Sequence, residues 1–464
     1  MTAAPDVQRG TDVGPGSSVV PATAGPAPAA PTPADRRLET ALALVAVGLV
    51  GLRVDLKSGI TSGLVAAVAL VPVWVPVLRR YAGARLFVGL GLLAAVSGVL
   101  LVELASPPPV IDANVRTNTV AVLVGVVSGV GVILWARTLT GQRAIGLAFG
   151  AGMLAGGAFG SGGGAGNAWK FVWAVPTAIT LLSLAQGRDG PGRGTRHKGR
   201  EVAALALLAL LSAVFDSRSY LATFVLAGLL VVLPLRPGAL SRRASWFWVT
   251  ATFAAVATAV YYLATTLLVD GYLGQAAQLR SIQQIQDSGS LLLGGRPELA
   301  ATLGLMRAYP TGFGAGYVPT PDTVLTAKTA LTAINYNPDN GYVDHYMFGG
   351  HVELHSTSGD LWANYGLAGL AFAALVGVLT LRGLSEVIAR RTATATVVFL
   401  CCWNLWNLLF SPLYSSAPTL TLGTGLVLAA RLRDGDRDDH GGRPGDSRPS
   451  GPGSHLGVGL LRDQ

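Results

Sequence analysis

The chain has 464 residues, of which 51% are hydrophobic and 13% charged, and its mean hydropathy is +0.49. Soluble domains carry about 25% charged residues, so this composition excludes an ordinary soluble enzyme. The net charge of +9 comes from basic residues in short, separated stretches, which argues against a nucleic-acid partner. The composition therefore predicts an integral membrane protein.

Residues 1–37 are rich in Ala, Pro, Gly and Thr and show no hydrophobic period. Such a segment cannot bury enough apolar surface to offset the entropy lost on ordering, which predicts a disordered cytoplasmic tail. It also lacks the charged start, apolar core and cleavage site of a signal peptide. Residues 432–464 are similarly polar, and they predict a second disordered cytoplasmic tail.

Twelve apolar segments lie between the two tails, most of them about 17–22 residues long, the length that crosses roughly 30 Å of hydrocarbon as a helix. We therefore expect an all-α, polytopic transmembrane helix bundle of about 12 spans, with nine spans in residues 38–269 and three in residues 361–431. Glycines at four-residue spacings in the fifth segment suit close helix packing in lipid. The segments are residues 38–52, 61–78, 86–104, 118–136, 144–160, 169–185, 201–215, 219–235, 246–269, 361–381, 394–411 and 415–431.

The basic residues indicate how the bundle is oriented in the membrane. With both termini in the cytoplasm, 25 of the 34 Lys and Arg residues fall on the inner side, as the positive-inside rule requires. The same topology places residues 270–360 outside the cytoplasmic membrane. This stretch is far longer than a simple connection, and its aromatic residues favour order, so we expect a large, partly helical extracytoplasmic loop that carries the chemistry.

Within this loop, residues 297–308 have apolar residues at helical spacing. Pro297 suits the first turn of a helix, and Pro310 stops one. The pattern predicts a helix with Arg296 next to its N-terminus, where the positive end of the helix dipole reinforces an anion site.

A glycine run and an isolated arginine are two further candidates for substrate contact. Gly312, Gly314 and Gly316 allow the backbone to approach a ligand closely, although a flexible turn explains them equally well. Arg218 lies between two apolar segments at the outer membrane boundary, where a charge is costly and often marks a substrate path. An ion pair with Asp216 is the alternative explanation for this arginine.

His355 is the candidate for proton transfer, because the ordinary pKa of histidine lies near neutrality. On one continuous helix, His355 and Gly366 would share a face at the outer mouth of the tenth span. Metal binding is an alternative, since His345, His351 and Glu353 lie nearby and two of the histidines have an i, i+4 spacing. No second ligand pair with defined spacing accompanies them, so no metal or cofactor is expected.

Three motifs follow one another in order: Ser217-Arg218; Gly295-Arg296-Pro297-Glu298 with Pro310 and the run Gly312-Phe313-Gly314-Ala315-Gly316; and His355 followed by Gly366 and Gly369. Together with the twelve apolar segments and the large loop before the last few, they resemble the O-antigen ligase and O-antigen polymerase family of polytopic glycosyltransferases. Ser219 and Ser356 depart from the family pattern, which commonly has Gly and Asn at these positions.

The resemblance implies an inverting, metal-independent glycosyltransferase. Its donor would be a glycan linked to a polyprenyl diphosphate such as undecaprenyl diphosphate, and its acceptor a hydroxyl of a glycan or lipid outside the inner membrane. Arg218 and Arg296 would bind the diphosphate, whose charge grows in the transition state. His355 would take the proton of the acceptor hydroxyl or orient it. The expected substrate-binding residues are Gly312, Gly314, Gly316, Tyr317 and Ser356.

Two forms of this activity stay open, namely a polymerase that adds repeat units and a ligase that moves a finished glycan, in exopolysaccharide or cell-wall assembly of the cell envelope. The rival from another class is a flippase or exporter of polysaccharide or lipid-linked glycan, since twelve spans also suit a transporter. Against transport, the charges concentrate in one outer loop and not at half-membrane depth, and no pair of broken helices recurs in the two halves. A structural scaffold is a third possibility, which the Arg and His residues disfavour.

Overall fold

The computed structural model describes residues 32–159, 166–187, 195–232, 242–272, 274–289, 291–339, 341–390 and 392–431. Within these ranges the chain forms 17 α-helices, three short 3₁₀ or π helices and one two-stranded antiparallel hairpin. The all-α expectation is therefore confirmed. Both predicted tails lie mostly outside the described residues.

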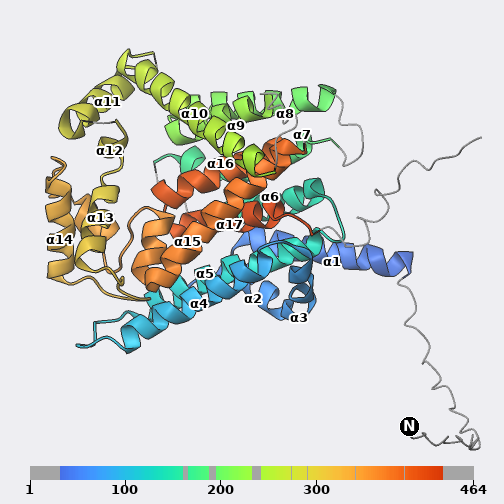
Figure 1. The fold of residues 1–464 in the computed structure, drawn as a ribbon, viewed down its shortest axis with the longest axis horizontal. Helices are drawn as coiled ribbons and strands as arrows, with labels where there is room; N and C mark the ends of the chain where they lie inside the picture. Colours follow the sequence, from blue (N-terminus) through green and yellow to red (C-terminus); the bar gives the residue numbers. More distant parts are fainter. Residues whose placement is uncertain are drawn as a thin grey trace, which may run out of the picture.

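The first half of the chain forms most of the bundle (Figure 1). A hairpin follows the first helix, and the next helix is broken into short pieces. The elements are α1 (Pro33–Leu52), β1 (Asp55–Lys57), β2 (Ile60–Thr61), α2 (Ser62–Ala69), α3 (Val71–Trp74), η1 (Pro76–Arg80), α4 (Ala84–Glu103), α5 (Ala113–Ala136), α6 (Gln142–Phe159), η2 (Trp169–Trp173), α7 (Ala174–Ala185), α8 (Thr195–Val214), α9 (Arg218–Val232) and α10 (Arg242–Val269).

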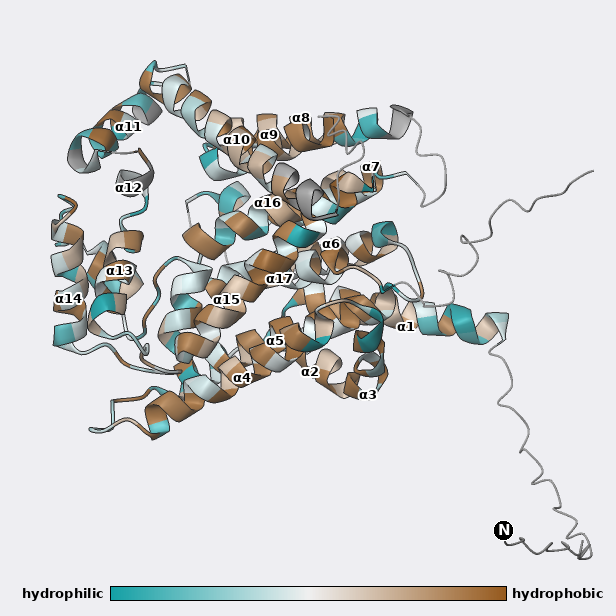
Figure 2. Cartoon of the chain, in the orientation of Figure 1, coloured by the Kyte–Doolittle hydropathy of each residue, from teal (hydrophilic) through white to brown (hydrophobic). Residues whose placement is uncertain are grey.

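The second half leaves the bundle, forms an outer group of short helices and then returns (Figure 1). The outer group has mixed hydropathy, whereas α4, α5 and α15 are predominantly apolar (Figure 2). Its elements are α11 (Gln275–Ser288), α12 (Leu291–Gly295), α13 (Glu298–Ala308), α14 (Pro321–Thr332) and η3 (Val343–Met347). The returning helices are α15 (Thr357–Ala389), α16 (Ala395–Phe410) and α17 (Leu413–Val427).

Helices occur at all twelve predicted apolar segments, but fewer of them qualify as membrane spans. By length and hydropathy, four helices of the described residues could cross a membrane, and a fifth span is possible if Ser62–Ala69 and Val71–Arg80, bent by 57°, form one broken span. Several other apolar helices are shorter. The structure thus indicates a multi-pass membrane protein with four or five candidate spans and does not show about twelve. The four are Ala84–Glu103, Ala113–Ala136, Thr250–Val269 and Thr357–Ala389.

The first helix begins before residue 38, the predicted start of the first apolar segment. Thr32 Oγ1 accepts a hydrogen bond from the Asp35 backbone N–H, and the Asp35 carboxylate accepts one from the Thr32 N–H. This reciprocal capping box, followed by Pro33 at the first helical position, starts α1 at Pro33. The boundary of the predicted tail at residue 37 is therefore wrong, because local polar capping extends the helix beyond its apolar segment.

Glycines allow α1 and α6 to pack backbone against backbone. A Cβ atom at Gly152 would collide with the carbonyl oxygen of Gly48, and one at Gly156 with that of Leu52. These positions belong to the four-residue glycine spacing of the fifth apolar segment. The expected close packing of this segment is thus confirmed.

The buried apolar residues form two separate cores. The larger core lies among the bundle helices, and the smaller one joins the outer group to the start of α15. In the smaller core, Ala301 and Leu305 of α13 pack with Ala327 and Leu331 of α14, and with Met347 of η3. Residues 301–354 therefore pack around a core that they share with the start of α15, which gives the core side chains fixed positions.

Candidate functional site

Four basic side chains converge where the outer group meets the bundle. Lys170 lies on η2, Arg218 is the first residue of α9, Arg280 lies on α11, and Arg296 precedes Pro297, the N-cap of α13. The positive charges of all three arginines act on Lys170, and Asp216 is the acidic group of the described residues that acts on it. We call these four residues the cation cluster, and with Asp216 they carry an excess of three positive charges.

Asp216 holds two members of the cation cluster together. Its carboxylate lies 2.9 Å from Nη2 of Arg280 and 3.6 Å from Nε of Arg218. Arg218 Nη1 also donates to Ser281 Oγ at 3.2 Å, which ties α9 to α11. Burial raises the pKa of Asp216, but the hydrogen bond and charge of Arg280, with the charge of Arg218, bring this pKa below its ordinary value. The ion pair considered from the sequence is therefore present, and it is shared with a second arginine.

Lys170 reaches the cluster because η2 is attached to the turn between α8 and α9. The ring of Trp169 stacks on Phe215 with a centroid separation of 5.6 Å. Asn167 Nδ2 donates to the Phe215 carbonyl oxygen at 2.6 Å. These contacts place Lys170 beside the turn that leads into Arg218. The local sequence of neither segment predicts this contact.

Arg296 lies next to the start of a helix, as the sequence predicts. Helix α13 begins at Glu298 with Pro297 as its N-cap and ends at Ala308, so the predicted helix over residues 297–308 is confirmed. The guanidinium of Arg296 lies over the ring of Trp406 on α16, 5.8 Å from its centroid. Its charge also acts on the hydroxyl of Tyr342. Arg296 thus connects the cation cluster with the surroundings of His355.

His355 does not lie on the helix that contains Gly366. Ser356 caps that helix, accepting a hydrogen bond from the Gly359 N–H at 3.2 Å and donating one to the Leu408 carbonyl oxygen at 3.0 Å. His355 precedes this cap with a φ of 48°, and Gly366 interrupts α15 with a φ of 64°. The expected continuous helix from His355 to Gly366 is wrong, because Ser356 caps the N-terminus of α15, which begins at Thr357, two residues after the histidine.

A carboxylate lies between two imidazoles at this position. Oε1 of Glu353 lies 3.5 Å from Nε2 of His355, and Oε2 lies 3.3 Å from Nε2 of His351. The hydrogen bond with Glu353 raises the pKa of His351 although burial opposes the rise. Nδ1 of His355 is buried and makes no hydrogen bond. Among the described residues, no group of three or more His, Cys, Asp or Glu side chains is placed to hold a metal ion.

Tyr342 links His355 to the helix that follows Arg296. Its ring centroid lies 5.6 Å from that of His355, and its hydroxyl donates a hydrogen bond to the carboxylate of Glu298. Burial, followed by the charge of Glu298, raises the pKa of Tyr342 far above its ordinary value, which keeps the hydroxyl protonated as a donor. Glu298 is itself buried, and its second carboxylate oxygen has no hydrogen-bond partner.

The glycine run packs against protein. A Cβ at Gly312 would collide with the carbonyl oxygen of Trp362, and one at Gly314 or Gly316 would meet α4 or the start of α5. The hydroxyl of Tyr317 lies 2.8 Å from Thr323 Oγ1. Close backbone approach thus brings the loop onto the bundle. The role of these residues and of Ser356 in substrate binding stays a prediction, since the structure does not bring them to the cation cluster.

Asp360 fixes the segment that carries His355. Its buried carboxylate accepts hydrogen bonds from the backbone N–H of Leu354 at 2.7 Å and of Leu413 at 2.8 Å. The residue before His355 is thereby joined to the start of α17. Asp360 was not among the predicted site residues, and its only signal in the sequence is an acidic residue directly before an apolar segment.

Comparisons with known protein families, characterised proteins and solved structures find no match to this chain. A function has to follow from the cation cluster and from the groups around His355. The cation cluster carries more positive charge than Asp216 neutralises. His355 has an Nδ1 without a hydrogen-bond partner. Its Nε2 lies beside the carboxylate of Glu353.

Proposed function

We propose that the protein is a membrane glycosyltransferase of the O-antigen ligase and polymerase type. It transfers or polymerises a glycan from a polyprenyl diphosphate donor onto an acceptor hydroxyl outside the cytoplasmic membrane. The cation cluster binds the diphosphate, and His355 serves the acceptor. The observation that carries the proposal is that Arg218, Arg280 and Arg296 all act by charge on Lys170, while Asp216 pairs with Arg218 and Arg280.

Charge repulsion within the cluster favours an anionic ligand. Like charges in one region repel, and partial burial weakens the screening by water. Lys170 and Arg296 have no ion-pair partner among the residues that the structure describes. A diphosphate esterified at both ends carries about two negative charges, and about three after its bond to the sugar breaks. A cluster with three excess positive charges therefore stabilises the leaving group more than the intact donor.

His355 is suited to accept the proton of the incoming hydroxyl. The carboxylate of Glu353 beside Nε2 favours the tautomer with its proton on Nε2, which leaves the lone pair on Nδ1. The acceptor oxygen forms a bond to the anomeric carbon while the bond from that carbon to the diphosphate oxygen breaks. The acceptor proton passes to the imidazole of His355, and the polyprenyl diphosphate leaves with the bonding electrons. Attack opposite to the leaving group inverts the configuration.

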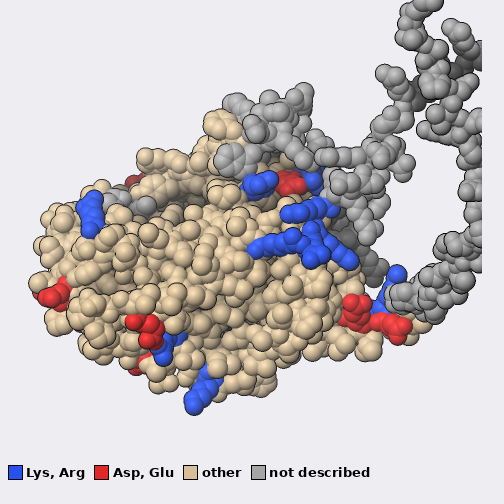
Figure 3. Space-filling model, turned by 60° about the horizontal axis from the view of Figure 1, so that its bottom comes forward, with Lys and Arg blue, Asp and Glu red and all other residues tan. Residues whose placement is uncertain are grey.

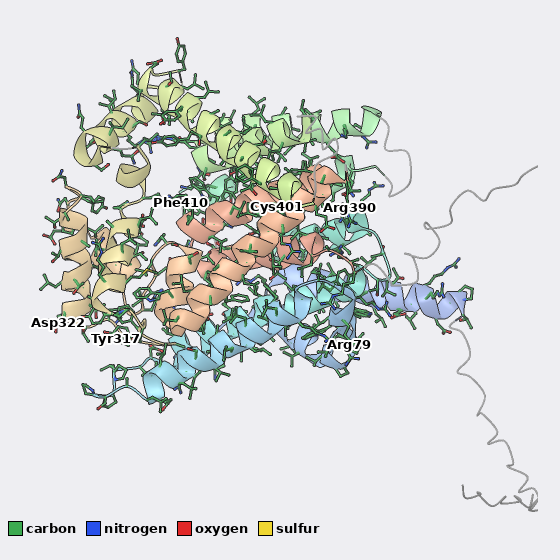
Figure 4. All side chains as sticks on the ribbon, viewed as in Figure 1. Arg79, Tyr317, Asp322, Arg390, Cys401 and Phe410 are labelled. Carbon is green, nitrogen blue, oxygen red and sulfur yellow. The ribbon has the colours of Figure 1, made fainter. Side chains whose placement is uncertain are left out.

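The distribution of charge supports the proposed topology, in which the twelve apolar helices span the inner membrane and residues 270–360 lie outside. One flank of the molecule shows few charged side chains, and most visible Lys and Arg gather toward one end (Figure 3). Arg79 and Arg390 lie in the half nearer that end, whereas Tyr317 and Asp322 lie at the opposite end (Figure 4). The basic residues would then face the cytoplasm and the cation cluster the outer surface.

Reconstituted protein distinguishes transfer from transport. Purified protein in lipid vesicles is supplied with a radiolabelled polyprenyl-diphosphate-linked glycan and an acceptor. A transferase releases polyprenyl diphosphate and yields a longer or relocated glycan, whereas a transporter moves the intact donor across the bilayer. We expect His355→Ala to lower the rate by about 10²–10⁴ without loss of inserted protein, and a chelator to have no effect. Intact donor on the far side with no released diphosphate would overturn the proposal.

Deletion of the gene separates the two forms of the activity. Loss of surface polymer with retention of single repeat units identifies a polymerase. Accumulation of finished, lipid-linked polymer identifies a ligase. The native strain with the gene restored is the matched control.

A further inference from the structure

The short helix η3 presents one aromatic ring to solvent from a firmly anchored position. Val343 and Met347 on this helix are buried in the smaller core, whereas Tyr346 is 66% exposed. Lys328 of α14 pairs with Asp344 on the same helix at 3.0 Å. The ring of Tyr346 is therefore held outward by an element whose opposite face is packed.

This ring belongs to a row that leads to His355. Tyr346 and Tyr342 stack with their centroids 5.8 Å apart and their planes at 30°. Tyr342 in turn lies 5.6 Å from His355 and is fixed by its hydrogen bond to Glu298. The row thus begins at the exposed surface and ends at the imidazole proposed to take the acceptor proton.

Polar groups border the row of rings. The side chains of Asp344, His351 and Glu353 are partly exposed and carry hydrogen-bonding atoms. A pyranose ring has one face of C–H groups, which packs against the electron-rich face of an aromatic ring, while its hydroxyls need hydrogen-bond partners around the edge. The exposed face of Tyr346, stacked on Tyr342 and close to these polar groups, matches both requirements.

We propose that Tyr342 and Tyr346 form the binding site for a sugar ring of the acceptor glycan, next to His355. This inference rests on the proposed glycosyl transfer. A lipid chain is a poorer occupant, because the ion-paired Asp344 and the His351–Glu353 pair border the rings and lose hydration against hydrocarbon. A sugar ring bound on Tyr346 places the glycan at the outer end of the row of rings that leads to the imidazole of His355.

The test compares Tyr346→Ala with Tyr346→Phe, which keeps the aromatic face. The acceptor is the glycan released by mild acid from the native lipid-linked donor, and transfer is measured at saturating donor. We expect Tyr346→Ala to raise the KM for this glycan about tenfold, the scale of one lost aromatic contact, with little change in kcat. Tyr346→Phe should behave like the native protein. Tyr272→Ala is the control, since Tyr272 is 76% exposed and follows α10.

Equilibrium binding of the same glycan provides a readout that does not depend on transfer. Titration calorimetry should show weaker binding to Tyr346→Ala than to the native protein. An unchanged KM and unchanged binding in Tyr346→Ala would overturn the site while leaving the transferase intact. Equal effects of Tyr346→Ala and Tyr272→Ala would also overturn it, because they indicate anchoring in the membrane interface. If the native protein bound the glycan through Tyr346 but transferred none of it, only the proposed function would be refuted.

Discussion

Replacement of Arg296 by Lys tests whether the cation cluster recognises a diphosphate by geometry or only by charge. A guanidinium presents a rigid fork that binds two phosphate oxygens, whereas an ammonium is a single, strongly hydrated point charge. Arg296 is partly exposed, has no ion-pair partner among the described residues and lies over Trp406. The substitution therefore keeps the net charge of the cluster and removes the planar, two-point contact.

The size of the effect follows from the loss of one hydrogen bond to a charged group. Such a bond contributes about 1.5–3 kcal/mol, so we expect kcat/KM for the donor to fall about 10- to 150-fold. The loss should appear mainly in kcat, because the charge of the diphosphate is greatest in the transition state. Arg218→Lys should show a similar loss, since its fork also contacts Asp216 and Ser281.

The assay is glycan transfer by purified variants from a lipid diphosphate donor, normalised to inserted protein. Arg307→Lys is the matched control, because Arg307 lies exposed in the last turn of α13, where any cation favours the helix dipole. This variant should retain native activity. If Arg296→Lys and Arg218→Lys were as active as Arg307→Lys, diphosphate recognition by the cluster would be refuted and a transporter would become the better explanation.

Three further predictions concern stability, pH and topology. Asp360→Asn, which cannot accept both backbone hydrogen bonds, should destabilise the protein by about 1–3 kcal/mol in thermal unfolding. Because the pKa of His351 is raised, its contact with Glu353 stabilises the fold fully below the ordinary histidine pKa and less as pH rises through the raised value. Glu353→Gln should flatten that dependence in melting curves, and an unchanged slope would contradict it. Cysteine at Ser288 should react with an impermeant reagent on intact cells, while cysteine at Ser18, outside the described residues, should not.

Local patterns in the sequence were sufficient to locate helices. The apolar segments coincide with helices, because burial of apolar surface and backbone hydrogen bonding along one segment need no distant partner. Helix α13 was predicted correctly for the same reason, since Pro297 and its apolar spacing act within a few residues. The glycines of α6 likewise identified a close helix contact before its partner, α1, was known.

Local patterns failed to predict the start of a helix where one capping side chain, and not the hydrophobic period, decided it. The spacing of His355 and Gly366 suited one helix face, but the Ser356 hydroxyl caps α15 and leaves His355 outside it. The start of α1 moved to Pro33 through a capping box of the same kind. Capping energies of about 1 kcal/mol decide where a helix ends, although they hardly alter a hydropathy profile.

The sequence by itself determined that this is a membrane protein and where its helices lie. It also identified Arg218 and Arg296 as candidate site residues. Only the tertiary structure decided that Lys170 and Arg280 join Arg218 and Arg296, and that Glu353 lies beside His355. The four cations come from separate segments, and their meeting depends on the packing of η2 against the turn before α9 and of α11 across it. Charge and hydrogen-bonding capacity are properties of a residue, but proximity is a property of the packed chain, which no local pattern encodes.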